Sequence, residues 1–155
     1  MTTWLNASFE MRFRLIGGLT VRFAVSQEQT DHALLLSPWP ESLLAFEPVW
    51  WRLAKRAQLV AMDLPGFGHS QHSDSLLSPR AMGEFIIVAA DSFGLEHPHV
   101  VAPGTGTAAA LFAAARHPGR AAEPSRRQRC RRGAAPGRRD GQGHHRGPGP
   151  GRVPP

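Results

Sequence analysis

The sequence VAMDLPGFGHS, residues 60–70, combines the end of a buried strand with a tight turn. Its first three residues are apolar, as in a strand that is covered on both faces of a sheet. Asp63 ends this strand, and Pro65, Gly66 and Gly68 follow it. Proline restricts the backbone at the start of a turn, and glycine permits positive φ within it. Taken alone, this stretch indicates no more than a glycine-rich connection.

The rest of the first 120 residues predicts a hairpin followed by alternating strands and helices. Apolar and polar residues alternate around Gly17-Gly18, as in two strands joined by a tight turn. Short continuous apolar runs indicate buried strands, and apolar residues spaced three and four apart indicate helices. We therefore expect an α/β fold, with an N-terminal hairpin and a mostly parallel sheet with flanking helices. The expected strands are 11–16, 21–25, 33–36, 59–62 and 100–101, and the expected helices are 48–57, 79–93 and 107–116.

A second turn, VVAPGTGTA at residues 100–108, joins a strand to a helix through small residues. A phosphate-binding loop of the Walker type needs a lysine, which is missing here. The dinucleotide-binding pattern fails as well, because Gly104 and Gly106 are followed by Ala109 where that pattern needs glycine. The remaining interpretation is a nucleophile elbow, a sharp turn that lifts one side chain above the sheet and needs small flanking residues.

Four stretches, in this order and spacing, resemble the alpha/beta-hydrolase family over roughly residues 12–120. The resemblance implies the N-terminal part of that fold, and a hydrolase lineage acting on a small organic ester, epoxide or halide without a cofactor. It also implies that Asp63 fixes a turn and is not the catalytic acid. The other structural turn residues are then Pro65, Gly66, Gly68 and Gly106. The stretches are LLLSPWPES at 34–42, VAMDLPGFGHS at 60–70, FGLE at 93–96 leading into Val100, and AAARHPGR at 113–120.

The resemblance also predicts where the nucleophile would stand. The family places a serine or aspartate twelve residues before the arginine of its Arg-His-Pro stretch, and here that position is Gly104. Glycine has no side chain that could attack a substrate. Thr105 is the alternative nucleophile, although a turn centred there would have Pro103 and Thr107 as its flanks.

Backbone N–H groups would form the oxyanion hole of such a site. By resemblance these belong to Trp39 and Thr105, with the alternative that Trp39 is a packing aromatic. The family's catalytic acid and histidine follow strands beyond residue 120. We therefore expect this chain to be truncated and catalytically inactive. The histidines within the hydrolase-like part are interpreted as exposed or capping residues: His69, His72, His97, His99 and His117.

The net charge of +6 is confined to the end of the chain. Residues 1–120 hold nine basic and ten acidic residues, whereas residues 121–155 hold nine arginines and two acids. Arg, Gly and Pro make up 22 of these last 35 residues, and Leu, Ile, Phe, Met and Trp are absent. This composition predicts a disordered tail separate from the 1–120 domain. A degenerate hydrolase body with a nucleic-acid-binding basic tail is the alternative function.

We favour a frameshift as the origin of the tail, so a nucleic-acid partner is not expected. One permitted set of codons for residues 141–155, read one base later, encodes Ala-Lys-Asp-Ile-Ile-Glu-Ala-Pro-Asp-Leu-Asp-Gly-Tyr-Arg. That peptide resembles hydrolase cap-region sequence. On this interpretation, Cys130 and the pair His144-His145 have no selected role.

The remaining expectations concern location and partners. The longest apolar run has eight residues, and a membrane span needs about 20. A basic segment followed by an apolar one is missing at the N-terminus, so we expect a cytoplasmic protein. The single cysteine argues against a disulfide within the chain and against a multi-cysteine metal site. The expected partner is a small-molecule substrate, with no cofactor, metal or membrane.

Overall fold

A hairpin opens the described part of the chain, residues 9–120 of the computed structural model. β1 (Met11–Ile16) and β2 (Leu19–Val25) pair in antiparallel orientation. Gly17 and Gly18 form the two-residue turn, with φ of +55° and +82°. Positive φ at both turn positions matches the twist of the flanking strands, and glycine adopts it without steric conflict. The predicted hairpin is confirmed.

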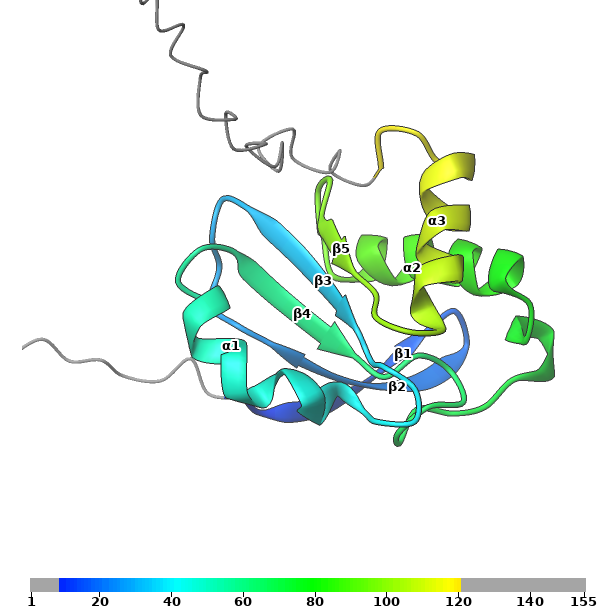
Figure 1. The fold of residues 1–155 in the computed structure, drawn as a ribbon, viewed down its shortest axis with the longest axis horizontal. Helices are drawn as coiled ribbons and strands as arrows, with labels where there is room; N and C mark the ends of the chain where they lie inside the picture. The colour runs from blue at the N-terminus through cyan, green and yellow to red at the C-terminus, as the bar shows by residue number, and fades with distance from the viewer. Residues whose placement is uncertain (1–8, 121–155) are drawn as a thin grey trace, which may run out of the picture. The chain divides into compact units, whose positions relative to one another are not determined.

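Three more strands complete the sheet, and they run parallel to one another (Figure 1). β3 (His32–Leu36) lies between β4 (Gln58–Met62) and β5 (His99–Val101). β2 pairs antiparallel with β4, so the strand order is β1-β2-β4-β3-β5. The sheet is therefore mixed, because the hairpin supplies the antiparallel pairings and the strand–helix units supply the parallel ones. Within the described residues, β5 is an edge strand.

The first helical segment begins earlier than its apolar spacing predicts. A 3₁₀ helix, η1 (Leu43–Phe46), leads directly into α1 (Glu47–Leu53), whereas the sequence predicts one helix at 48–57. The Ser42 side chain accepts a hydrogen bond from Leu44 N–H and so caps η1, which explains the early start. The last residues of the predicted helix form a turn instead.

The other two helices lie close to their predicted positions. α2 (Pro79–Ser92) starts after Ser78, whose Oγ accepts a hydrogen bond from Ala81 N–H at 3.1 Å. A short 3₁₀ helix, η2 (Asp74–Leu76), precedes it, and α3 (Gly106–Arg116) follows β5. Serine as N-cap with proline at the first helical position is a strong start signal, which explains why this boundary is predictable.

Helices cover both faces of the sheet (Figure 1). Leu34 and Leu36 of β3 pack in a cluster with residues of α2 and α3, whereas Leu35 of the same strand packs with Trp50 of α1. Successive side chains of a strand point to opposite faces, so a strand between two helical layers must be apolar at every position. This requirement explains the continuous apolar runs of β3 and β4. Residues 121–155, for which the sequence predicts a disordered tail, lie outside the described residues.

Candidate functional site

The turn after β4 is built around the carboxylate of Asp63, which is completely buried. Oδ2 accepts hydrogen bonds from Arg22 Nε at 2.7 Å and from His69 N–H at 3.1 Å. Arg22 Nη2 lies 2.6 Å from the same oxygen, so the two side chains form a buried ion pair. Gly68 has φ of +52°, and a Cβ at this position would lie 2.0 Å from Asp63 Oδ2. The carboxylate therefore leaves room only for glycine at position 68.

Pro65 and Gly66 continue this turn over the end of the sheet. Gly66 has φ of +85° and donates its N–H to Gln71 O at 3.2 Å. A Cβ at Gly66 would lie 3.0 Å from His72 Nδ1, which is a tight contact. The turn and the residues after it are thereby folded back on each other.

The turn after β5 contains the candidate elbow. Gly104 has φ of +64°, and its carbonyl accepts a hydrogen bond from Thr107 N–H at 3.1 Å. The Thr107 hydroxyl donates to Ala102 O at 2.5 Å, which closes the turn from its other side. Gly106 is buried, and a Cβ there would make an ordinary contact of 3.5 Å with Ala102 Cβ. A small residue fits at position 106, whereas positive φ favours glycine at position 104.

The candidate elbow lies beside the loop that follows β3. A Cβ on Gly104 would have a single neighbour within 4 Å, the backbone nitrogen of Trp39 at 3.9 Å. Among the residues that the structure describes, neither Trp39 N–H nor Thr105 N–H donates a hydrogen bond to another residue. Two backbone donors thus stand next to the space that a side chain at position 104 would occupy.

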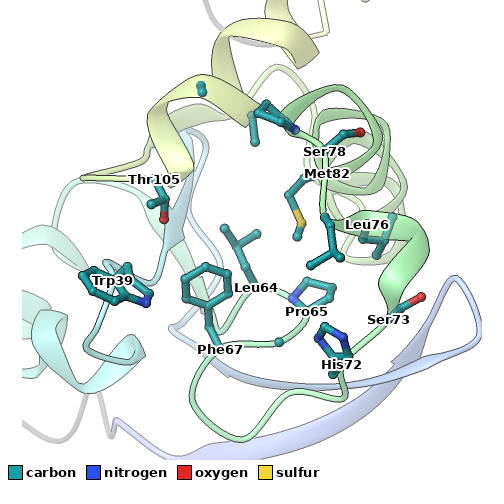
Figure 2. Close-up of a pocket in the computed structure, with 15 residues that line it drawn as sticks. Trp39, Leu64, Pro65, Phe67, His72, Ser73, Leu76, Ser78, Met82 and Thr105 are labelled. Atoms are coloured by element: carbon teal, nitrogen blue, oxygen red, sulfur yellow. The ribbon is translucent and has the colours of Figure 1, made fainter.

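A pocket of about 530 Å³ opens in front of this arrangement (Figure 2). Trp39 and Thr105 border one side of it in Figure 2, and His72 and Leu76 border the other. Its volume is in the range of small-molecule sites. The lining is mainly apolar: Trp39, Leu64, Pro65, Gly66, Phe67, His72, Ser73, Leu76, Leu77, Ser78, Pro79, Met82, Thr105, Ala108 and Ala109.

His72 is the one ionisable side chain among the described residues that line this pocket. Its Nε2 lies 2.8 Å from Asp74 Oδ1, and both side chains are largely exposed. The pocket can therefore enclose the apolar body of a ligand and offer a few polar groups at its edge. Within residues 9–120, no group of three or more His, Cys, Asp or Glu residues is placed to hold a metal ion.

The structure places half of the eight predicted site residues in the lining of this pocket. Trp39, Pro65, Gly66 and Thr105 line the pocket, whereas Asp63, Gly68, Gly104 and Gly106 are absent from its lining. Among the five histidines interpreted as exposed or capping, only His72 lines the pocket.

The sequence around Arg22 does not mark it as a site residue, although Arg22 is only 5% exposed on β2. Strand alternation predicts that a charged residue at this position faces solvent. Asp63 is the residue whose position in the sequence predicts such a partner, because a buried carboxylate at the end of an apolar strand needs a nearby cation.

No family model and no curated protein matches this chain. Solved structures do match it. An epoxide hydrolase from Vigna radiata is 22% identical, with a TM-score of 0.65, over 72% of this chain and 37% of its own length. A haloalkane dehalogenase loop variant from Bradyrhizobium elkanii is 25% identical, with a TM-score of 0.64, over 72% of this chain and 38% of its own length. A predicted CIB-like hydrolase from Thermoplasma acidophilum is 15% identical, with a TM-score of 0.67, over 74% of this chain and 59% of its own length.

These neighbours are alpha/beta-hydrolases, and this chain has their fold over its described residues. The chain spans less than two fifths of the length of the epoxide hydrolase and the dehalogenase. None of the described helices combines the length and the hydropathy of a membrane-spanning segment.

Proposed function

We propose that this chain descends from hydrolases that act on a small organic ester, epoxide or halide, and that it binds such a molecule without turning it over. The epoxide hydrolase and the haloalkane dehalogenase among the matching structures support the lineage. The mainly apolar pocket of about 530 Å³ supports binding of a small organic molecule.

The observation that carries this proposal is the glycine at the apex of the elbow. A side chain at position 104 would extend toward Trp39 N–H into otherwise open space. A nucleophile placed there could attack a substrate whose developing negative charge is held by that donor. Gly104 provides the backbone conformation of the elbow and no attacking atom. Thr105 lies one residue past the positive-φ position, with φ of −63°, so we assign the nucleophile position to Gly104.

Trp39 N–H and Thr105 N–H are the proposed oxyanion-hole donors. They come from two different loops and have no partner among the described residues. Trp39 is 67% exposed, which argues against the alternative that it is a packing aromatic. A ligand carbonyl oxygen in the pocket could accept hydrogen bonds from both groups.

Hydrolysis of p-nitrophenyl acetate by the full chain tests the proposed inactivity. We expect the same rate with protein as with buffer, and no change on Thr105→Ala. Turnover that follows the folded fraction of the protein and disappears in Thr105→Ala would contradict the assignment to Gly104.

Binding of 4-nitroacetanilide, the amide counterpart of that ester, tests the pocket. Hydrogen–deuterium exchange followed by mass spectrometry suits this measurement because it uses dilute protein. We expect the ligand to slow exchange in residues 37–44 and 104–109. Saturating ligand that leaves exchange in both segments unchanged would contradict binding at this site.

We also propose that the functional domain is residues 1–120, and that residues 121–155 derive from a shifted reading frame and take no part in the site. The charge balance and the change in composition after Arg120 support this boundary. The nucleotide sequence tests it, because an open hydrolase frame one base away is expected there. Salt-dependent RNA binding that is lost on deletion of residues 121–155 would instead support the alternative nucleic-acid-binding function.

A further inference from the structure

The loop that carries Trp39 is attached to the end of β4 by a buried serine. Ser37 donates its backbone N–H to Met62 O at 3.0 Å. Its Oγ accepts a hydrogen bond from Leu64 N–H at 3.2 Å. Ser37 has no exposed surface, so water cannot replace either bond without local opening. The start of the loop therefore follows the backbone of β4 and the turn after it.

A second attachment holds the other end of this loop. Leu43 N–H donates to Asp63 Oδ1 at 2.7 Å, and both residues are fully buried. Trp39 lies between the two attachments, six residues apart at Ser37 and Leu43. Its position beside Gly104 thus depends on the direction in which the Asp63 carboxylate points.

Arg22 determines that direction from a third segment, β2. Its guanidinium approaches Oδ2 through both Nε and Nη2, and His69 N–H donates to the same oxygen. With Oδ2 held by these donors, Oδ1 faces Leu43. A two-point contact between guanidinium and carboxylate restricts rotation of the carboxylate more than a single hydrogen bond does.

We propose that Arg22 and Asp63 are positioning residues for the oxyanion-hole donor of this site: the buried pair holds Leu43, and through it the loop that places Trp39 N–H beside Gly104. The ligand-binding part of this proposal rests on the proposed function. The loop-positioning part does not, because the bonds that carry it are present without a ligand. Breaking the pair is expected to release the loop locally and to weaken the hold on a carbonyl ligand.

Three variants of the full chain test the pair. Asp63→Asn replaces one acceptor oxygen by an amide group that donates, so one of the facing N–H groups loses its partner. Arg22→Met removes the cation at similar length, and Arg22→Lys keeps the charge but not the two-point contact. Asp91→Asn is the matched control, because it makes the same chemical change in the exposed ion pair of Asp91 with Arg120.

Hydrogen–deuterium exchange is measured for each variant with and without 4-nitroacetanilide. In Asp63→Asn and Arg22→Met, we expect exchange in residues 41–44 to accelerate about ten-fold more than exchange in α3, the factor that corresponds to one lost hydrogen bond. We expect a similar increase in the dissociation constant for 4-nitroacetanilide, an intermediate effect for Arg22→Lys, and none for Asp91→Asn. Exchange in α3 serves as the internal reference, because it reports the loss of global stability that breaking a buried ion pair also brings.

Two results would overturn the positioning role. Equal acceleration in α3 and in residues 41–44 would mean that the pair only stabilises the whole domain. Unchanged exchange in residues 41–44 of folded Arg22→Lys and Arg22→Met would mean that Leu43 is held without Arg22. If 4-nitroacetanilide does not bind the unmodified chain, the proposed function fails, and exchange in residues 41–44 without ligand still decides the positioning role. If Asp63→Asn does not fold, the two Arg22 variants decide it in the same way.

Discussion

Gly68 and Asp63 constrain each other sterically in the candidate site. The carboxylate takes the space that a Cβ at position 68 would need, and it also binds Arg22 and two backbone N–H groups. Breaking a buried ion pair by removing one partner typically destabilises a protein by about 3–5 kcal/mol. A substitution that displaces the Asp63 carboxylate should therefore lower the free energy of unfolding by an amount close to that range.

A substitution at Gly94 is the control that separates backbone strain from the steric conflict at Gly68. Both glycines have positive φ, but a Cβ at Gly94 would meet nothing within 4 Å. We expect Gly94→Ala to lower the free energy of unfolding by about 1–2 kcal/mol, the penalty of the left-handed region for an L-residue. Gly68→Ala should lower it by about 3 kcal/mol or more, because the methyl group also displaces a buried carboxylate.

Pulse proteolysis in urea measures the free energy of unfolding of both variants at low protein concentration. Equal losses would show that strain alone determines the choice of glycine, and that the Asp63 carboxylate moves aside at little cost.

The contact between α2 and α3 depends on two features, a close crossing and an ionic contact. Gly83 lies at the crossing, where a Cβ would come within 2.8 Å of Ala109 O and 3.0 Å of Ala113 N. Farther along, the carboxylate of Glu84 accepts hydrogen bonds from Arg116 Nε at 2.5 Å and His117 Nε2 at 2.6 Å. Both features matter for the site, because α2 and α3 contribute pocket-lining residues.

Gly83→Ala should destabilise the domain although alanine is the better helix former. The gain in helix propensity is about 1 kcal/mol, and overpacking at a helix crossing costs about 1–3 kcal/mol. We expect a net loss in the free energy of unfolding, together with weaker binding of 4-nitroacetanilide. An increase in stability would show that the two helices separate easily.

Glu84 should make stability depend on pH in the acidic range. Hydrogen bonds from His117 and Arg116 hold the pKa of the Glu84 carboxyl below its ordinary value of 4.5. A depressed folded-state pKa stabilises the protein above the unfolded-state pKa, and this contribution is lost as the pH falls through the folded-state pKa. The advantage of the unmodified chain over Glu84→Gln should therefore shrink as the pH falls below about 4.5.

Urea unfolding at a series of pH values measures that difference. Glu41→Gln is the control, because Glu41 is an exposed acid for which no ion pair is present among the described residues. A difference between the unmodified chain and Glu84→Gln that does not change with pH would contradict the role of the ionised carboxylate.

In the described part of the molecule, the sheet ends at an edge strand, β5. β5 pairs with β3 on one side and, within residues 9–120, with no strand on the other. Val101 is 43% exposed on this edge, and Leu111 and Phe112 of α3 are exposed as well. An apolar edge with unpaired backbone groups favours association between chains. We therefore expect the chain to be poorly soluble in isolation.

A charge on this edge should raise solubility. We expect Val101→Lys to increase the soluble fraction after expression, because lysine on an edge strand opposes strand pairing between molecules. Val49→Lys is the matched control, since Val49 is a 42% exposed valine on α1, away from the sheet edge. The soluble fraction of each variant is measured after centrifugation, and we expect a larger gain for Val101→Lys than for Val49→Lys. An equal gain in both variants would indicate a general effect of charge and not an effect of the edge.

Much of the element order could be predicted from the sequence. The continuous apolar runs at β3 and β4 indicate strands covered on both faces, and Ser78-Pro79 marks the start of α2. These signals are local, because strand and helix periodicity and capping depend on residues a few positions apart. The Gly-rich turns at Gly68 and Gly104 were visible for the same reason. The 3₁₀ helix η1 ahead of α1 was less predictable, because it depends on the Ser42 cap and not on apolar spacing.

The amino-acid sequence by itself determined the strand and helix order, the positive-φ turns and the absence of a side chain at position 104, since each depends on local chemistry. Only the tertiary structure decided that Arg22 is buried against Asp63, that Trp39 N–H lies beside Gly104, and that both loops border one pocket. Arg22 and Asp63 are 41 residues apart, and the contact between them exists because β2 and β4 are neighbours in the sheet. Strand pairing over such distances depends on the packing of the whole domain, and no local pattern in the chain encodes it.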